Sequence, residues 1–321
     1  MNKIPIVFAF DDNYALPASI AIQSLVDCAH SDTQYDIFVL HSGLKQSVMR
    51  KIEKIHPINW IRVDASMLKD APMGWSGIET YYRLLVADLI PQYDKIIWSD
   101  VDVLFRGDLT DIYNMSIGDA DWAGVIAERA DEKNGIHPHY PENTHDFIYM
   151  PGFMIINARK WRAENKLKTF FDIISTFGAR LKFFDLDVLN LGADKIASVP
   201  FEYCVLERIY DNDDIKNAPE YPWLARAHSH AMLAHAKENP MIIHYAGGWP
   251  KIWMRKYDDI PKYYWEYIKN SPFYNREFYF PGIKTKLKII GAKFLIKTCP
   301  VKKWRHELRH WREMYKQRLK N

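Results

Sequence analysis

The stretch that decides the fold is Lys95-Ile96-Ile97-Trp98-Ser99-Asp100-Val101-Asp102-Val103-Leu104. Its apolar first half predicts a strand that is buried on both faces, as in a parallel sheet covered by helices. Two carboxylates follow at i and i+2, where the strand leaves the sheet, so a turn there can direct both to one point. Such oxygen ligands suit Mg²⁺ or Mn²⁺. An Asp-x-Asp pair is also common by chance, and a solvated turn is the alternative.

Strand and helix patterns alternate on both sides of this stretch. Strands are predicted at 4–10, 35–40 and 60–63, helices at 15–29, 45–56 and 79–89, and later strands at 153–157 and 197–200. This order predicts an α/β domain of the Rossmann type with a mostly parallel sheet. Ligands of such sheets bind beyond the carboxyl ends of the strands. Asp11 and Asp12 follow one strand and Asp100 another, so the sequence predicts a site at this edge.

Two polar segments interrupt the regular pattern. Residues 128–146 are rich in His, Pro and Asn and are predicted to form a long surface loop, of the kind that often binds ligands or covers a site. Residues 211–240 are predicted to be irregular.

Composition limits the class of protein. The chain has 321 residues, of which 48% are apolar, enough for a substantial core. Its three cysteines, Cys28, Cys204 and Cys299, have no disulfide or zinc spacing, which indicates a reducing compartment. The apolar N-terminal run stops at Asp11, and no apolar run approaches the roughly 20 residues of a membrane span. We therefore expect a cytoplasmic protein.

The C-terminal segment 284–321 differs from the rest of the chain in charge. It carries 13 Lys and Arg residues against two acids, which leaves residues 1–283 with a net charge of −8. Trp304, Leu308, Trp311 and Tyr315 recur at steps of three and four between basic residues, which predicts a basic amphipathic helix. We expect a membrane-associating tail on the inner face of the cytoplasmic membrane, although docking onto the acidic body is an alternative. Nucleic acid is not an expected partner, because no nucleic-acid-binding fold accompanies the basic residues.

Two further motifs carry polar groups. An apolar run delivers His244 into the turn at Gly247, and Lys251 follows. His244 could be a third metal ligand, and the glycine backbone and Lys251 could contact phosphate, but a core histidine before an ordinary turn fits too. Asp185 and Asp187 open an apolar helical stretch, where N-capping is the simplest interpretation.

Taken in order, these residues resemble glycosyltransferase family 8, the retaining, glycogenin-like transferases. The likeness is strongest to bacterial galactosyl- and glucosyltransferases of lipopolysaccharide and lipo-oligosaccharide synthesis. It rests on six segments in collinear order: 8–15, 80–84, 100–104, 156–162, 185–190 and 244–253.

The resemblance implies a GT-A-like catalytic domain over residues 1–283, a UDP-sugar donor and a Mn²⁺ ion, with Mg²⁺ as an alternative. It implies that Asp100, Asp102 and His244 bind the metal. Catalytic roles fall to Asp185, Arg83 and Glu128. The residues that it implies for the nucleotide and its phosphates are Ala9, Asp11, Asn13, Tyr14, Arg83, Val101, Gly247 and Lys251.

This sequence departs from the family pattern around the donor sugar. Met150-Pro151-Gly152 replaces the usual Asn-Ala-Gly or Asn-Ser-Gly, and Leu186 stands between Asp185 and Asp187 where the family often has Gln. The expected function is transfer of galactose or glucose from UDP to a glycan or lipid-linked saccharide. The alternatives are a metal-dependent nucleotide-sugar pyrophosphatase or nucleotidyltransferase, and a non-catalytic membrane-associated binding protein.

Overall fold

The computed structural model describes residues 3–73, 77–131, 135–138, 140–247, 250–280, 282 and 297. The chain divides into two compact units, Met1–Gly247 and Gly248–Asn321. The predicted tail, 284–321, lies outside the described residues except for Lys297, so its amphipathic helix stays a prediction. Within the described part of the chain, no helix combines the length and the apolar character that crossing a membrane requires.

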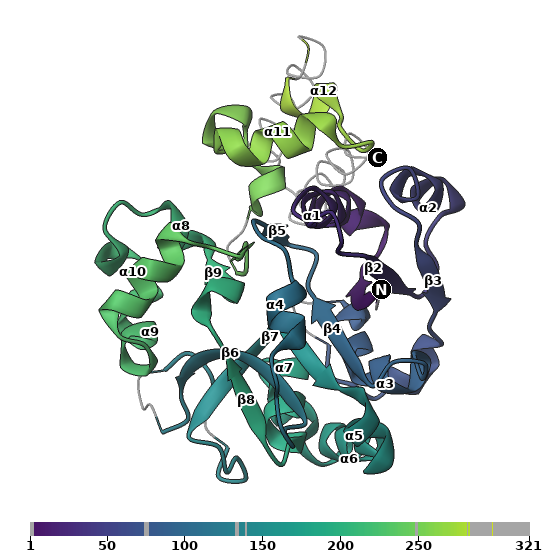
Figure 1. Cartoon of the computed structure of the whole chain (residues 1–321), viewed down its shortest axis with the longest axis vertical. Coiled ribbons are helices and arrows are strands. Elements are labelled where there is room, and N and C mark those ends of the chain that lie inside the picture. The colour runs from purple at the N-terminus through teal and green to yellow at the C-terminus, as the bar shows by residue number, and fades with distance from the viewer. Residues whose placement is uncertain are drawn as a thin grey trace. The chain divides into compact units, whose positions relative to one another are not determined.

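The first unit is built on a seven-stranded sheet (Figure 1). Its strands, in spatial order, are β3 (Asn59–Arg62), β2 (Tyr35–His41), β1 (Ile4–Ala9), β4 (Lys95–Ser99), β7 (Phe147–Asn157), β6 (Trp122–Arg129) and β8 (Ile196–Val199). β7 runs antiparallel to both of its neighbours, and the other pairings are parallel. The predicted α/β class with a mostly parallel sheet is therefore confirmed. A second sheet holds β5 (Val103–Phe105), β10 (Ile242–His244) and β9 (Val205–Leu206).

Helices complete both units. Those of the first unit are α1 (Ala15–Asp27), α2 (Gln46–Ile52), α3 (Val86–Leu89), α4 (Thr110–Asn114), α5 (Ala158–Ala163), α6 (Lys166–Phe177), α7 (Asp185–Gly192), α8 (Glu207–Asp211), α9 (Tyr221–Ala227) and α10 (His230–Glu238). Its 3₁₀ helices are η1 (Asp12–Tyr14), η2 (Ala65–Leu68), η3 (Ile78–Leu85), η4 (Gly178–Arg180), η5 (Phe201–Cys204) and η6 (Ile215–Asn217). The second unit has η7 (Ile252–Met254), η8 (Tyr257–Asp259), α11 (Lys262–Asn270) and α12 (Arg276–Tyr279).

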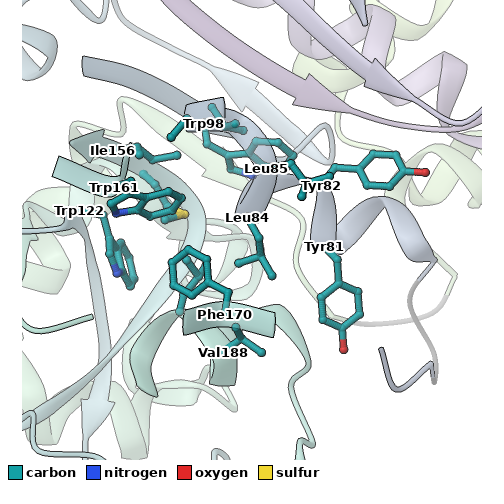
Figure 2. Close-up of a cluster of buried hydrophobic side chains, with 14 of the residues drawn as sticks. Tyr81, Tyr82, Leu84, Leu85, Trp98, Trp122, Ile156, Trp161, Phe170 and Val188 are labelled. Atoms are coloured by element: carbon teal, nitrogen blue, oxygen red, sulfur yellow. The ribbon is translucent and has the colours of Figure 1, made fainter. Parts of the chain in front are cut away.

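Side chains alternate along the strands, so successive residues pack against layers on opposite faces of the sheet. Val7, Ile96 and Trp98 point into a core built with η3, α3, α5, α6 and α7. Figure 2 shows part of this core, in which Trp161 and Phe170 lie with their rings 5.0 Å apart. Phe8 points the other way, because side chains alternate along a strand, and its ring meets Phe105 of β5 at 6.4 Å. The second sheet and α1 therefore cover the opposite face.

The structure corrects two predicted elements. Segment 211–240 is not irregular, because it contains α9 and α10. Each of these helices buries only one leucine, Leu224 or Leu233, so neither leaves a clear apolar stripe in the sequence. The helix predicted at 79–89 is a 3₁₀ helix up to Leu85, followed by the short α3. The 3₁₀ turn brings Thr80 and Arg83 to the edge of the sheet where β4 ends.

Replacement of Ile97 by Ala tests the importance of the central strand. Ile97 is fully buried in β4, so Ile97→Ala should lower the free energy of unfolding by about 2–5 kcal/mol through the cavity it leaves. Ile136, which is 51% exposed, provides the matched control, and Ile136→Ala should change stability by less than about 0.5 kcal/mol. Urea unfolding measures both, and equal effects of the two substitutions would contradict this packing.

Candidate functional site

Asp100, Asp102 and His244 meet at one point beyond the end of β4. One ligand atom from each lies within 4.8 Å of the others. Nε2 of His244 is 3.2 Å from Oδ1 of Asp102 and 3.7 Å from Oδ2 of Asp100. His244 is 7% exposed, whereas the two carboxylates are partly exposed. The family resemblance implied that these three residues come together, whereas the residues alone left a core histidine as the alternative for His244; the structure brings the three together.

Pairing of backbone segments produces this cluster. β10 runs antiparallel to β5, which puts His244 opposite Val103, and the Tyr245 N–H donates to the Asp102 carbonyl over 2.8 Å. On the other side, the Asp100 N–H donates to the Gly152 carbonyl over 2.8 Å. Backbone hydrogen bonds therefore hold residues 100–102 between β7 and β10.

A bulge in β7 gives the cluster its space. β7 pairs with β6 at Met154 and then at Met150, opposite consecutive residues of β6, so residues 151–153 bulge from this ladder. A Cβ atom on Gly152 would lie 2.4 Å from Cε1 of His244 and 3.4 Å from Oδ2 of Asp100. Only a glycine allows the imidazole to lie against the strand here. The Met150-Pro151-Gly152 segment is thus part of the site.

Arg83 holds Asp100 in one orientation. Nη2 of Arg83 donates to Oδ1 of Asp100 over 2.7 Å, and Nε1 of Trp98 donates to the same oxygen over 3.2 Å. Nη1 of Arg83 donates to the Pro151 carbonyl over 2.6 Å. Because Oδ1 is taken by these donors, Oδ2 is the oxygen that faces His244. Arg83 therefore acts on the cluster through Asp100.

Asp185 lies on the other side of Arg83. Its Oδ2 is 3.0 Å from Nε of Arg83, and its Oδ1 accepts from Oγ1 of Thr80 over 3.0 Å. Burial raises the pKa of Asp185 to about 6, although the charge of Arg83 opposes the shift and Asp100 adds to it. Asp187 has a separate role, because its Oδ2 accepts from the Lys182 and Phe183 N–H groups ahead of α7. The predicted N-capping by these acids is wrong, because Phe184, and neither acid, is the N-cap residue of α7; Asp187 instead holds the segment before the helix.

Of the predicted nucleotide residues, Ala9 ends β1, and Asp11, Asn13 and Tyr14 follow it. The Asp11 carboxylate accepts from the Asn13 N–H over 3.0 Å and from the Tyr14 N–H over 3.2 Å, which fixes the turn after Ala9. Burial raises the pKa of Tyr14 to about 12, with smaller contributions from Asp102, Asp11 and Asp100. β1 and β4 are parallel neighbours in the sheet, so their carboxyl ends lie side by side. Tyr14 lies close enough to the cluster for the charges of Asp102 and Asp100 to raise its pKa. Val101 is buried between the two metal-binding candidates.

Glu128 was predicted to contact the sugar, but in the structure its carboxylate binds groups of the protein itself. It is fully buried, and its carboxylate accepts from the backbone N–H groups of Ile136 and His137 and from Nδ1 of His137. Burial would raise the pKa of Glu128, but the hydrogen bonds and charge of His137 outweigh it, and the pKa falls below its ordinary value. Both carboxylate oxygens already accept hydrogen bonds from Ile136 and His137, so the structure gives no support to the predicted contact of Glu128 with a sugar.

The remaining predicted residues lie at the end of the first unit and in the second. Gly247 has φ of +69°, a left-handed conformation that favours glycine. Lys251 belongs to the second unit, where it precedes η7. Its predicted phosphate contact, like that of Gly247, stays a prediction.

Sequence reasoning missed three contributors to the site. Thr80 contacts Asp185, Gly152 gives the His244 ring its space, and Cys204 lies with its Sγ 3.2 Å from Nδ1 of His244. A glycine inside an apolar strand pattern signals a close approach, so Gly152 could have been found. Nothing in the local sequence marks Thr80 or Cys204.

The donor set fits a divalent cation. Two carboxylates and one imidazole, already converged and with room made by Gly152, suit Mn²⁺ or Mg²⁺. Burial would lower the pKa of His244, but Cys204 and Asp102 outweigh it and hold the pKa well above its ordinary value. Binding of a cation through Nε2 requires the neutral ring, so metal binding and protonation of His244 compete.

A second cluster of acids, Asp121, Glu164 and Asp194, has different chemistry. Lys166 reaches all three acids, at 3.2, 3.5 and 2.7 Å, and Lys160 also approaches Asp121 and Glu164. Lysines thus already neutralise this cluster.

The fold is that of solved glycosyltransferases. Galactosyltransferase LgtC, solved with donor and acceptor sugar analogues, aligns over 84% of this chain and 96% of its own, with a TM-score of 0.69 and 22% identity. The chain belongs to glycosyl transferase family 8, whose family model matches residues 5–256.

Curated relatives extend the comparison. A lipopolysaccharide 1,2-glucosyltransferase of Escherichia coli is 24% identical, with 75% of this chain and 70% of the relative covered. General stress protein A of Bacillus subtilis strain 168 is 25% identical, with 82% of this chain and 93% of the relative covered.

The raised pKa of Asp185 predicts a specific dependence of stability on pH. The folded-state pKa is about 6 and the ordinary value is 3.8, so the folded protein retains a proton that the unfolded chain loses between these values. Stability contributed by this proton is present below about pH 4 and is lost as pH rises through about 6. Asp185→Asn removes the titration, so relative to wild type its free energy of unfolding should rise by about 2 kcal/mol from about pH 4 to about pH 7.

Urea unfolding of the metal-free proteins across this range measures the difference. Asp70→Asn, at an exposed position, is the control and should follow wild type. A difference between Asp185→Asn and wild type that does not change with pH would contradict the assignment.

Proposed function

We propose that this glycosyltransferase moves a hexose, glucose or galactose, from a UDP-sugar to a saccharide or lipid-linked saccharide with retention of configuration. We further propose that it acts in bacterial lipopolysaccharide or cell-surface polysaccharide synthesis. The observation that carries the proposal is the convergence of Asp100, Asp102 and His244 beyond the end of β4. Of the similar proteins, the Escherichia coli protein is a glucosyltransferase and LgtC is a galactosyltransferase, which supports both sugars as candidates.

Mn²⁺ is the cofactor that we propose for this cluster. Oδ2 of Asp100, the Asp102 carboxylate and Nε2 of His244 would hold it, and the imidazole favours Mn²⁺ over Mg²⁺, which prefers oxygen ligands. When bound, the ion supplies positive charge that stabilises a diphosphate leaving group. The nucleotide would bind across the ends of β1 and β4, with Asp11, Asn13 and Tyr14 at the base and Gly247 at the phosphates. For Lys251, of the second unit, the phosphate contact rests on the family resemblance alone.

Arg83 and Asp185 would orient the donor sugar. Arg83 fixes Asp100 and Asp185 in one arrangement, and water has little access because Arg83 and Asp185 are 4% and 6% exposed. Leu186 has no nucleophilic atom, so double displacement through that position is excluded. We infer front-face attack: an acceptor oxygen bonds to C1 as the bond from C1 to UDP breaks, and the acceptor's proton passes to the leaving phosphate.

The basic tail would keep the enzyme at its acceptor. Residues 284–321 are proposed to bind an anionic membrane surface on the cytoplasmic side, where a lipid-linked saccharide is held. This proposal rests on the sequence pattern alone.

Asp102→Asn tests the metal-dependent activity. Because the substitution removes one charged ligand, it should lower Mn²⁺-dependent UDP release by at least about a hundredfold. Asp119→Asn is the matched control, since Asp119 is exposed, pairs with Lys195 and lies before β6, and it should leave turnover unchanged. Turnover is measured with a panel of UDP-sugars.

The products separate the proposal from its alternatives. A transferase releases UDP and, without acceptor, free sugar, whereas a pyrophosphatase would release UMP and sugar phosphate. Retained activity in Asp102→Asn would refute the metal assignment. Lack of turnover by the wild-type protein with every UDP-sugar would refute the proposed donor.

A further inference from the structure

Cys204 touches the candidate metal ligand on the side away from the cluster. The thiol is 1% exposed and unpaired with another cysteine, and its Sγ is 3.2 Å from Nδ1 of His244. Nε2 of the same ring faces the two carboxylates. Each ring nitrogen of His244 therefore has its own neighbour, a carboxylate on one side and sulfur on the other.

The fold fixes this contact from two directions. β9 begins directly after Cys204 and pairs in parallel with β10, so that Val205 lies opposite Ile243 and Leu206 opposite His244. The rings of Tyr203 and Phe153 stack at 5.6 Å with 21° between their planes. This stack joins the residue before Cys204 to the residue after Gly152. The ring of His244 consequently lies between the Cys204 thiol and the glycine backbone.

A histidine that binds a metal through one ring nitrogen needs a hydrogen-bond acceptor for the N–H of the other. To bind a cation through Nε2, the neutral ring must carry its proton on Nδ1, and metal-binding histidines nearly always donate that N–H to a carboxylate, a carbonyl or water. At His244, Sγ of Cys204 takes the place of these usual acceptors, 3.2 Å from Nδ1. Sulfur is a weak acceptor, but a buried N–H without any acceptor costs more.

We propose that Cys204 is a positioning residue of the metal site: its sulfur accepts the Nδ1–H of His244 and thereby fixes the ring and its tautomer for metal binding through Nε2. The inference rests on the proposed metal site. It assigns a function to a cysteine that neither coordinates the ion nor contacts the substrate.

The test compares two substitutions of similar size. Cys204→Ser keeps an oxygen that can accept the N–H, whereas Cys204→Val fills the space without an acceptor. Mn²⁺ alone is titrated into each full-length protein, and the free ion is followed by electron paramagnetic resonance. We expect the Kd for Mn²⁺ to rise by about 10–100-fold in Cys204→Val and by less than about threefold in Cys204→Ser.

Controls separate this inference from the metal site itself. Cys28 is the matched control, because its thiol donates a hydrogen bond to the Phe105 carbonyl and not to the metal cluster. The Cys28→Ser variant should bind Mn²⁺ like wild type. Circular dichroism checks folding, and Cys204→Ala replaces the valine variant if that variant is unfolded. Equal Kd values for the serine and apolar variants, whether unchanged or both weakened, would overturn the role of Cys204 alone. Absence of Mn²⁺ binding by the wild-type protein would overturn the metal site with it.

Discussion

The buried guanidinium of Arg83 is the group on which the arrangement of the site depends. A charge with 4% exposure must be paired, and Arg83 pairs with Asp100 of the β4 turn, Asp185 of α7 and the Pro151 carbonyl of β7. Three segments distant in sequence are thus joined by one side chain. Because Arg83 and Trp98 occupy one oxygen of Asp100, the other is presented to His244.

Much of the fold and the location of the site could be predicted from the sequence, and each feature that could not be predicted has a physical cause. The buried runs of β1, β2 and β4 predict the parallel sheet, and the placement of Asp100 after β4 predicts the edge at which the site forms. α9 and α10 were missed because single leucines anchor them to the core. Gly152, Thr80 and Cys204 contribute through contacts between segments that lie far apart in sequence. At Glu128 the sequence suggested a sugar contact that the structure does not support. Its carboxylate oxygens accept hydrogen bonds from the backbone N–H groups of Ile136 and His137 in the loop that follows.

The site combines family machinery with differences around the donor sugar. The metal-binding candidates and Arg83 stand where the family resemblance implied, and the family assignment is secure over residues 5–256. Met150 and Pro151 replace the first two residues of the usual segment, whereas Gly152 keeps its glycine. The Pro151 carbonyl accepts from Arg83, and the Gly152 carbonyl accepts from the Asp100 N–H. Of these three residues, Gly152 is the one whose missing side chain makes room for His244.

The central claim is that Asp100, Asp102 and His244 hold a divalent cation that binds the donor's diphosphate. A crystal structure of the protein with Mn²⁺ and UDP, using anomalous scattering to locate the ion, tests it most directly. The account predicts one anomalous peak within about 2–2.5 Å of Oδ2 of Asp100, the Asp102 carboxylate and Nε2 of His244, with the diphosphate completing its coordination. Bound UDP with no peak at these three residues would contradict it.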